Sequence, residues 1–347
     1  MENKNNLDLT VVVPFYKRDN FALKILKAID IENKELSLKI EVIYVDSYSS
    51  DLLENILSNY IKESDLKYRV IHTDNYVGVK RNCGIKSSNS EYIICMDDDC
   101  IPGKDFLKNH FNKLTNSKVN KVIYSGMVMF PDHLCETSNY YRFRNFRHRV
   151  YDNIYLTNET MDFHNIITMN MSFKKSDLIN ENLFFDNDYT TYGLEDTQFG
   201  LDAMKKNFLL KTCLAPVIHQ ESTSIDLFIL KIRNFAQNYF FRFYQKNDAY
   251  LINRINSSIN KHSIISHISL VRIARSHAYM KYNYPIIINL LRIIPIFLMP
   301  FSFILKTLLK ISDKKRVLYF VWMYKALIII TIISTLFDAK LKTKNFI

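Results

Sequence analysis

Three adjacent carboxylates, Asp97, Asp98 and Asp99, follow directly on the strand-like apolar run Tyr92–Met96. Like charges this close repel one another, and the end of an apolar strand solvates them poorly. A bound cation would stabilise such a cluster, and its hard oxygen ligands suit Mg²⁺ or Mn²⁺, which usually carry a phosphate in turn. An acidic turn exposed at a strand end is the alternative interpretation of the three acids taken alone.

The elements that precede this cluster predict where it lies. Strand patterns cover residues 9–13, 40–45, 68–71 and 92–96, and helical patterns cover 21–31, 52–61 and 79–86. This alternation predicts an α/β fold with a parallel sheet covered by helices. Ligands of such sheets gather at the carboxyl ends of the strands. Asp46 and the acidic cluster both lie at such ends, which favours a ligand site over an acidic turn.

Length and cysteine usage set the class of protein. A chain of 347 residues can bury one α/β core with about a hundred residues to spare. The five cysteines are odd in number and include no CxxC pair, so neither a disulfide framework nor a zinc site is expected, and a reducing cytosol is the natural setting. The first residues show no apolar segment of signal-peptide length before the first strand, so no signal peptide is expected.

The net charge of +11 is distributed unevenly along the chain. Residues 1–221 hold 27 Lys/Arg against 31 Asp/Glu, whereas residues 222–347 hold 19 against 4. A basic, apolar C-terminal third attached to a slightly acidic globular part indicates an anionic partner, either a membrane surface or a nucleic acid. Since RNA-binding modules carry glycine-containing aromatic signatures that are absent here, the membrane is the expected partner and nucleic acid is not.

Two hydrophobic stretches, 284–309 and 317–337, are long enough to span a bilayer, but each contains polar or proline residues. The segment that joins them, KTLLKISDKKR, bears five positive charges and one negative. If both stretches crossed, this segment would lie opposite the preceding domain, against the positive-inside tendency. We therefore expect helices that lie in the cytoplasmic interface of the membrane. A two-helix hairpin and a soluble helical domain are the alternatives.

Five features occur in a fixed order along the first 225 residues. They are VVVPFYKR (11–18), VIYVDSYSSD (42–51), NYVGVKRNCG (75–84), ICMDDDCIP (94–102), and YGLEDTQFG (192–200) followed by VIHQES (217–222). In this order and spacing the sequence resembles the inverting, nucleotide-sugar-dependent family-2 glycosyltransferases of the GT-A fold, and residues 163–200 are similar to bacterial capsule and chondroitin-type polymerases. The resemblance implies a GT-A domain with a Rossmann-like, mostly parallel sheet over residues 1–225, followed by a helical, membrane-associated region over residues 226–347.

The resemblance assigns residues to the nucleotide-sugar donor. Asp46 matches the residue that bonds the uracil or ribose, with capping of the following helix as the alternative. Pro14 and Phe15 would form the wall of the nucleotide pocket, unless they only pack in the core. Lys80 and Arg81 would reach the diphosphate or the base, although such residues often belong to a solvated helix face.

The acidic cluster and a downstream histidine match the metal site of this family. Asp97 and Asp99 correspond to an Asp-x-Asp pair, in which Asp99 binds the metal and Asp97 lies toward the ribose or a metal-bound water. Asp98 is counted with the donor-binding residues. His219 would supply a further ligand to Mn²⁺ or Mg²⁺, and a structural histidine at a strand end is the alternative. The metal would neutralise the leaving UDP.

The Glu195-Asp196 pair matches the acceptor side of the family's site. Asp196 lies in the first turn of a predicted helix, where the helix dipole favours a carboxylate. It would take the proton from an acceptor hydroxyl that attacks the anomeric carbon, and Glu195 would orient the acceptor. Helix capping is the alternative role for both acids.

The sequence departs from the family pattern at two places. The usual Asp-Asp-Gly-Ser is Asp46-Ser47-Tyr48-Ser49 here, which affects recognition of the base. The arginine that commonly follows the Glu-Asp pair is replaced by Asp202. The basic residues of segment 142–149 are candidates to contact the diphosphate in its place or to bind a lipid pyrophosphate acceptor. A plain surface loop is the alternative for this segment.

These observations predict an inverting, metal-dependent glycosyltransferase that moves a hexosyl or N-acetylhexosaminyl group from a UDP-sugar to a hydroxyl of a lipid-linked or growing cell-surface glycan, at the cytoplasmic face of the cell membrane. A sugar-nucleotide nucleotidyltransferase is disfavoured because VVVPFYKRDN lacks the glycine-rich phosphate loop. The other alternative is a catalytically silent relative that acts as a membrane-bound partner in polysaccharide assembly.

Overall fold

The structure is a computed structural model that describes residues 7–48, 51–62, 64–149, 160–191, 193–220, 224–247, 249–250, 293–315 and 319–337. The chain divides into two compact units. The first comprises residues 1–137, 141–190 and 195–222, and the second comprises residues 138–140, 191–194 and 223–347.

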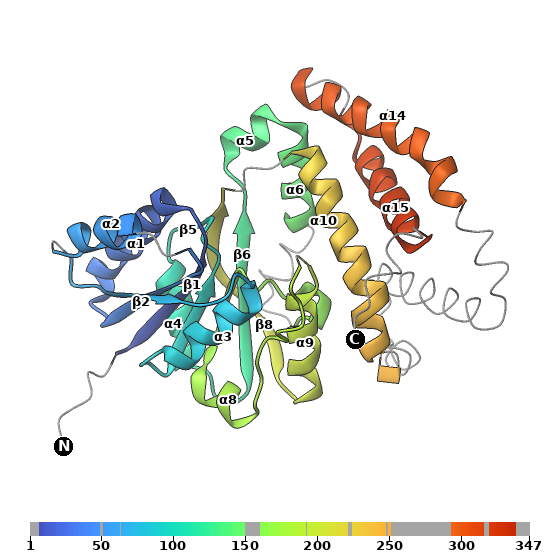
Figure 1. The fold of residues 1–347 in the computed structure, drawn as a ribbon. Coiled ribbons are helices and arrows are strands. Elements are labelled where there is room, and N and C mark those ends of the chain that lie inside the picture. Colours follow the sequence, from blue (N-terminus) through green and yellow to red (C-terminus); the bar gives the residue numbers. More distant parts are fainter. Residues whose placement is uncertain are drawn as a thin grey trace. The chain divides into compact units, whose positions relative to one another are not determined.

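The first unit contains one eight-stranded sheet (Figure 1). Its strands are β1 (Leu9–Phe15), β2 (Ile40–Asp46), β3 (Lys67–His72), β4 (Tyr92–Met96), β5 (Cys100–Pro102), β6 (Val122–Met129), β7 (Asn170–Lys174) and β8 (Leu209–His219), in the spatial order β3-β2-β1-β4-β7-β6-β8-β5. Strands β1 to β4 pair in parallel, as does β6 with β8. Strand β7 is antiparallel to both its neighbours, and β5 is antiparallel to β8. The predicted mostly parallel α/β sheet of the GT-A type is confirmed.

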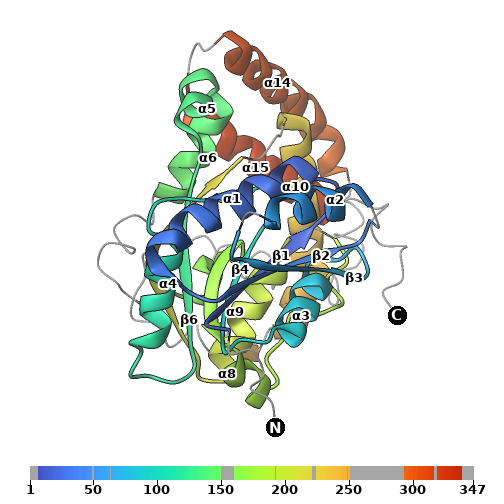
Figure 2. The same cartoon turned by 90° about the vertical axis from the view of Figure 1, so that its left-hand side faces the viewer.

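Helices cover both faces of this sheet. Helices α1 (Asp19–Leu36), α2 (Asp51–Ile61) and α4 (Phe106–Thr115) lie on one face, and α3 (Val77–Ser87) lies on the other, as Figure 2 shows for α1, α2 and α3. Alternate residues of β1, such as Val11 and Val13, pack in the core that α1 covers. Val12 points the opposite way and contacts α3 at Gly84, where an added Cβ would collide with the valine side chain. Glycine therefore lets α3 approach the sheet closely.

The remaining described elements are helices and helical turns. They are α5 (Asp132–Thr137), α6 (Asn139–Arg149), a 3₁₀ turn (Phe163–Asn165), α8 (Lys175–Asn180), α9 (Glu195–Lys205), α10 (Ile225–Asn238), a π-helical turn (Tyr239–Phe243), α14 (Ile294–Lys315) and α15 (Val321–Phe337). The aromatic-basic segment is helical as far as Arg149, so its interpretation as a plain loop is wrong over residues 142–149. Strand β8 runs without interruption over 11 residues and ends at His219.

In the second unit, α10 packs against α15, and α14 packs against α15. Helix α14 is the described helix that is long and apolar enough to cross a membrane, over Ile294–Asp313, and α15 is apolar but shorter. Large apolar side chains of α14, including Phe297, Phe301 and Phe303, are more than 60% exposed. The predicted stretches 284–309 and 317–337 extend beyond these helices, and their residues 284–292 and 317–318 lie outside the described residues.

Candidate active site

The carboxyl ends of β1, β2 and β4 bring the predicted donor-side residues to one edge of the sheet. Phe15, the last residue of β1, is in register with Asp46, the last residue of β2. Strand β4 pairs with β1 in parallel and ends at Met96, immediately before Asp97. The buried Asp46 carboxylate accepts a hydrogen bond from the backbone N–H of Tyr48 (3.0 Å). The acids predicted to share a site therefore lie at the same edge of the sheet.

Arg18 joins two acids of the cluster. Its Nη1 bonds Asp98 Oδ1 and lies 3.0 Å from Asp99 Oδ2. The second oxygen of Asp98 accepts the backbone N–H of Tyr16 at 2.9 Å. Burial raises the pKa of Asp98 to about 6, although the charge of Arg18 acts to lower it. The two carboxylates are thus held by a guanidinium and a backbone amide from the segment that follows β1.

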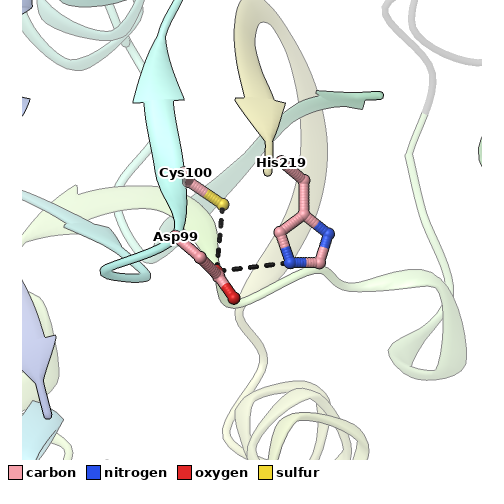
Figure 3. A group of neighbouring side chains, drawn as sticks. All are labelled: Asp99, Cys100 and His219. Atoms are coloured by element: carbon pink, nitrogen blue, oxygen red, sulfur yellow. Dashed lines mark hydrogen bonds and ion pairs between the residues drawn. The ribbon is translucent and has the colours of Figure 1, made fainter. Parts of the chain in front are cut away.

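Asp99, Cys100 and His219 form a cluster whose ligand atoms lie within 4.8 Å of one another (Figure 3). The antiparallel pairing of β5 with β8 sets Cys100 opposite His219, and His219 Nε2 lies 3.2 Å from Asp99 Oδ1. Burial and the neighbouring carboxylates raise the pKa of the Cys100 thiol well above its ordinary range, so the thiolate that metals prefer is disfavoured. The remaining carboxylate and imidazole donors fit Mn²⁺ or Mg²⁺ better than a soft metal.

The surroundings of His219 link this cluster to the basic segment 142–149. Its Nδ1 is buried and has no hydrogen-bond partner among the described residues, so the contact that usually orients a metal-ligating histidine is not made on this side of the ring. Its ring packs against Phe130, at 5.3 Å between centroids, and the guanidinium of Arg144 lies 5.6 Å from the centre of the Phe130 ring. Arg144 therefore lies near the cluster of Asp99, Cys100 and His219, whereas Arg142 of the same segment is exposed.

Arg81 links Asp97 to the Glu195-Asp196 pair. It is 2% exposed, its Nη2 lies 2.6 Å from Asp97 Oδ1, and its guanidinium stacks 5.1 Å from the Phe185 ring centre. Burial alone would lower the pKa of Arg81, but the negative charges of Asp97 and Glu195 raise it. Its Nε and Nη1 have no partner in the described part of the chain. The buried charge of Arg81 thus attracts two carboxylates, Asp97 and Glu195, which are far apart in the sequence.

Glu195 and Asp196 begin helix α9, as predicted. Burial and the charge of Asp196 raise the pKa of Glu195 to about 7, against the attraction of Arg81. Burial also raises the pKa of Asp196, whose Oδ1 accepts the Thr197 backbone N–H at 2.7 Å. Glu195 is 9% exposed and Asp196 is more accessible. Of the two acids, Asp196 is therefore the one that a second substrate reaches more easily.

Other residues that were predicted to bind the donor lie at this edge of the sheet but contact the protein itself. Lys80 is buried and its Nζ donates to the Phe15 carbonyl (2.6 Å) and to Asn75 Oδ1 (2.9 Å), so the interpretation as a solvated helix face is wrong for this lysine. Burial lowers its pKa. The Phe15 ring packs edge-to-face on Tyr44, and Pro14 is a buried residue of β1. The donor-binding roles of these residues stay predictions.

The sequence did not single out Arg18 or Cys100, although both stand inside quoted motifs. Arg18 is the last residue of VVVPFYKR and follows β1, whose carboxyl end lies beside that of β4. The same sheet-edge argument that placed Asp46 would have placed Arg18 near the acidic cluster. Cys100 had no such signal, because only the pairing of β5 with β8 turns it toward His219.

Residues 10–178 match the family described as Glycosyl transferase family 2. Just under half of the chain is therefore similar to a family-2 glycosyltransferase domain. An uncharacterized glycosyltransferase of Rickettsia conorii is 28% identical over 102 residues, which make up 29% of this chain and 16% of that protein. Among solved structures, the chain is similar to mannosyltransferase PcManGT from Pyrobaculum calidifontis, solved with GDP-Man and Mn²⁺, with a TM-score of 0.53 at 15% identity. This match covers 95% of the present chain and 86% of the mannosyltransferase chain. The match to TarS of S. aureus (residues 1–349), solved with UDP-GlcNAc, has a TM-score of 0.45 at 17% identity and covers 66% of the present chain and 65% of the TarS chain. The family match supports the predicted resemblance to family-2 glycosyltransferases, and the mannosyltransferase match confirms the predicted GT-A fold.

Proposed function

We propose that the protein is an inverting, metal-dependent glycosyltransferase that moves a hexosyl or N-acetylhexosaminyl group from a UDP-sugar to a hydroxyl of a lipid-linked or growing cell-surface glycan. The observation that carries this proposal is the link through Arg81. Its guanidinium bonds Asp97, and its charge interacts with Glu195, the neighbour of the proposed base. This link supports the placement of the proposed donor-side and acceptor-side acids in one site.

Each residue has a defined task in this reaction. Asp99 and His219 would hold Mn²⁺ or Mg²⁺, which neutralises the charge of the leaving diphosphate, and Asp97 would lie toward the ribose. Asp196 accepts the proton of the acceptor hydroxyl while that oxygen bonds to the anomeric carbon. The bond from the anomeric carbon to the diphosphate oxygen breaks, and its electron pair leaves with the diphosphate. Glu195 orients the acceptor, so attack from the face opposite the diphosphate inverts the anomeric centre.

The exposed apolar and basic residues of the second unit support binding of the enzyme to a membrane. Helix α14 exposes a series of large apolar side chains, which a membrane would cover. Residues 222–347 carry 19 Lys/Arg against 4 Asp/Glu, which favours anionic headgroups of the cytoplasmic face. We propose that this region holds the enzyme at the cell membrane, as an interfacial helix or as a hairpin, where a lipid-linked acceptor is available.

The choice of nucleotide is tested by calorimetric titration of the detergent-purified protein with UDP, GDP and dTDP, each with and without Mn²⁺. UDP is the expected ligand, and the GDP-Man bound by the mannosyltransferase makes GDP the comparison of interest. Binding of UDP that depends on Mn²⁺ would support the donor site. Binding of GDP alone would keep the reaction but change the donor. If none of the three binds, the catalytically silent membrane partner becomes the better description.

A further inference from the structure

Arg18 supplies a positive charge at the point where the proposed metal would bind. Its guanidinium contacts both Asp98 and Asp99. The arginine side chain is 41% exposed, whereas those of Asp98 and Asp99 are 9% and 11% exposed. Arg18 therefore covers two nearly buried acids on their solvent side.

The two oxygens of Asp99 face different partners. Oδ2 lies 3.0 Å from Arg18 Nη1, and Oδ1 lies 3.2 Å from His219 Nε2. A divalent cation that bound Asp99 and His219 would lie beside the guanidinium, and two like charges at such short range repel. The metal and Arg18 are thus expected to compete for the same carboxylate.

We propose that Arg18 is a mobile counter-cation of the metal site, which holds Asp98 and Asp99 until a metal binds and is then released to the diphosphate of the donor. This inference rests on the proposed function. A guanidinium suits both partners, because its planar donors match carboxylate and phosphate oxygens. The freed side chain would remain at the carboxyl edge of the sheet, where the donor is expected.

The backbone of Arg18 allows this movement. Arg18 is the N-cap residue of α1, and its carbonyl accepts the backbone N–H groups of Phe21 (2.7 Å) and Ala22 (3.2 Å). The side chain takes no part in the cap. A change of the guanidinium position therefore leaves the start of the helix intact, and so should a substitution of this side chain.

The exchange predicts that metal and nucleotide bind cooperatively. The metal alone must displace Arg18, whereas the metal together with a diphosphate gives the displaced guanidinium a new partner. Because coupling between two ligands is reciprocal, the nucleotide should tighten metal binding by the same factor as the metal tightens nucleotide binding. Arg18 would carry part of this coupling.

The test compares Mn²⁺ binding to the full-length wild type, Arg18→Gln and Arg18→Lys by calorimetry and by the electron paramagnetic resonance of free Mn²⁺. Lys17→Gln is the matched control, because Lys17 is the adjacent cation but lies over the Tyr48 ring, at 4.4 Å. Loss of the competing ion pair should tighten binding of Mn²⁺ alone about fivefold in Arg18→Gln. UDP binding at saturating Mn²⁺ should weaken about tenfold in the same variant, as for loss of a charge-assisted contact. Arg18→Lys should bind Mn²⁺ with nearly the wild-type affinity. Lys17→Gln should match the wild type in both the Mn²⁺ titration and the UDP titration.

The opposite signs of the two effects distinguish this role from a structural one. Weaker binding of both Mn²⁺ and UDP by Arg18→Gln would show that Arg18 only orients the carboxylates, and would overturn the inference. Unchanged affinities in Arg18→Gln would overturn it as well, while leaving the metal site of the proposed function in place. If the wild type binds no Mn²⁺ even with UDP, the metal-dependent function fails together with the inference. Thermal unfolding of each variant without ligand verifies that it folds.

Discussion

Ionisation of the buried Glu195 should lower the free energy of unfolding at neutral and alkaline pH, and Glu195→Gln should restore it. Burial and Asp196 raise the pKa of Glu195 from 4.5 to about 7. Between about pH 4.5 and pH 7, the folded protein therefore retains on Glu195 a proton that the unfolded chain has released. Because the unfolded state binds fewer protons there, stability falls as the pH rises from about 4.5 to 7, and the full cost is present above pH 7.

The size of the effect follows from the same pKa. A rise from 4.5 to about 7 corresponds to about 3 kcal/mol, at roughly 1.4 kcal/mol per pH unit. Glu195 titrates together with Asp196, and glutamine also loses the attraction of Arg81, so we expect Glu195→Gln to gain about 1–2 kcal/mol at pH 8. For a domain of this size that gain raises the midpoint of thermal unfolding by roughly 3–6 °C.

The assay is thermal unfolding of the wild type and Glu195→Gln at pH 4.5 and pH 8, with the exposed Glu54→Gln as the control. Glu195→Gln should unfold at a higher temperature than the wild type at pH 8 and near the same temperature at pH 4.5. Glu54→Gln should match the wild type at both. Destabilisation by Glu195→Gln at pH 8 would refute the reasoning, because it would mean that the ionised glutamate is stabilised by Arg81 more than it is penalised by burial.

Three further predictions concern the reaction and the membrane. Asp196→Asn should lower the rate of sugar transfer about 10²- to 10⁴-fold, as for loss of a general base, and calorimetry should show metal-dependent UDP binding nearly unchanged; lost binding would remove Asp196 from the base role. Asp99→Ala should weaken UDP binding when Mn²⁺ is present and leave it unchanged when Mn²⁺ is absent, and weakening in both conditions would contradict its role as a metal ligand. Deletion of residues 284–347 should release the protein from the membrane fraction on sedimentation, whereas unchanged sedimentation would contradict the anchor.

The parallel half of the fold follows from local patterns in the sequence. Strands such as β1 and β4 are buried on both faces and read as continuous apolar runs, so their existence and direction could be predicted. The placement of Asp46 and Asp97 at one edge then follows from the shared direction of parallel strands. The predicted end of the first strand at residue 13 was wrong, because β1 continues through Pro14 to Phe15 although proline usually interrupts a strand.

The antiparallel additions could not be predicted, because they depend on contacts between distant segments. Strand β7 enters between β4 and β6 with a sequence, NMSFK, that gives no sign of its partners. The pairing of β5 with β8 brings His219 to Asp99 across more than a hundred residues, and a three-residue strand carries almost no pattern of its own. The resemblance to a family gave the metal role of His219, but local periodicity alone would not have.

The contacts of Arg81 also join distant segments, so local sequence patterns did not predict them. These contacts suggest how the two halves of the proposed site depend on each other. Its one guanidinium is attracted to both Asp97 and Glu195. The negative charge of Asp97 also acts to raise the pKa of Glu195, so that pKa should fall when the cation of a donor complex compensates the charge of Asp97. The acceptor side then holds more negative charge after the donor has bound than before. A site built in this way favours proton removal from the acceptor only once a sugar is in place to receive the attack.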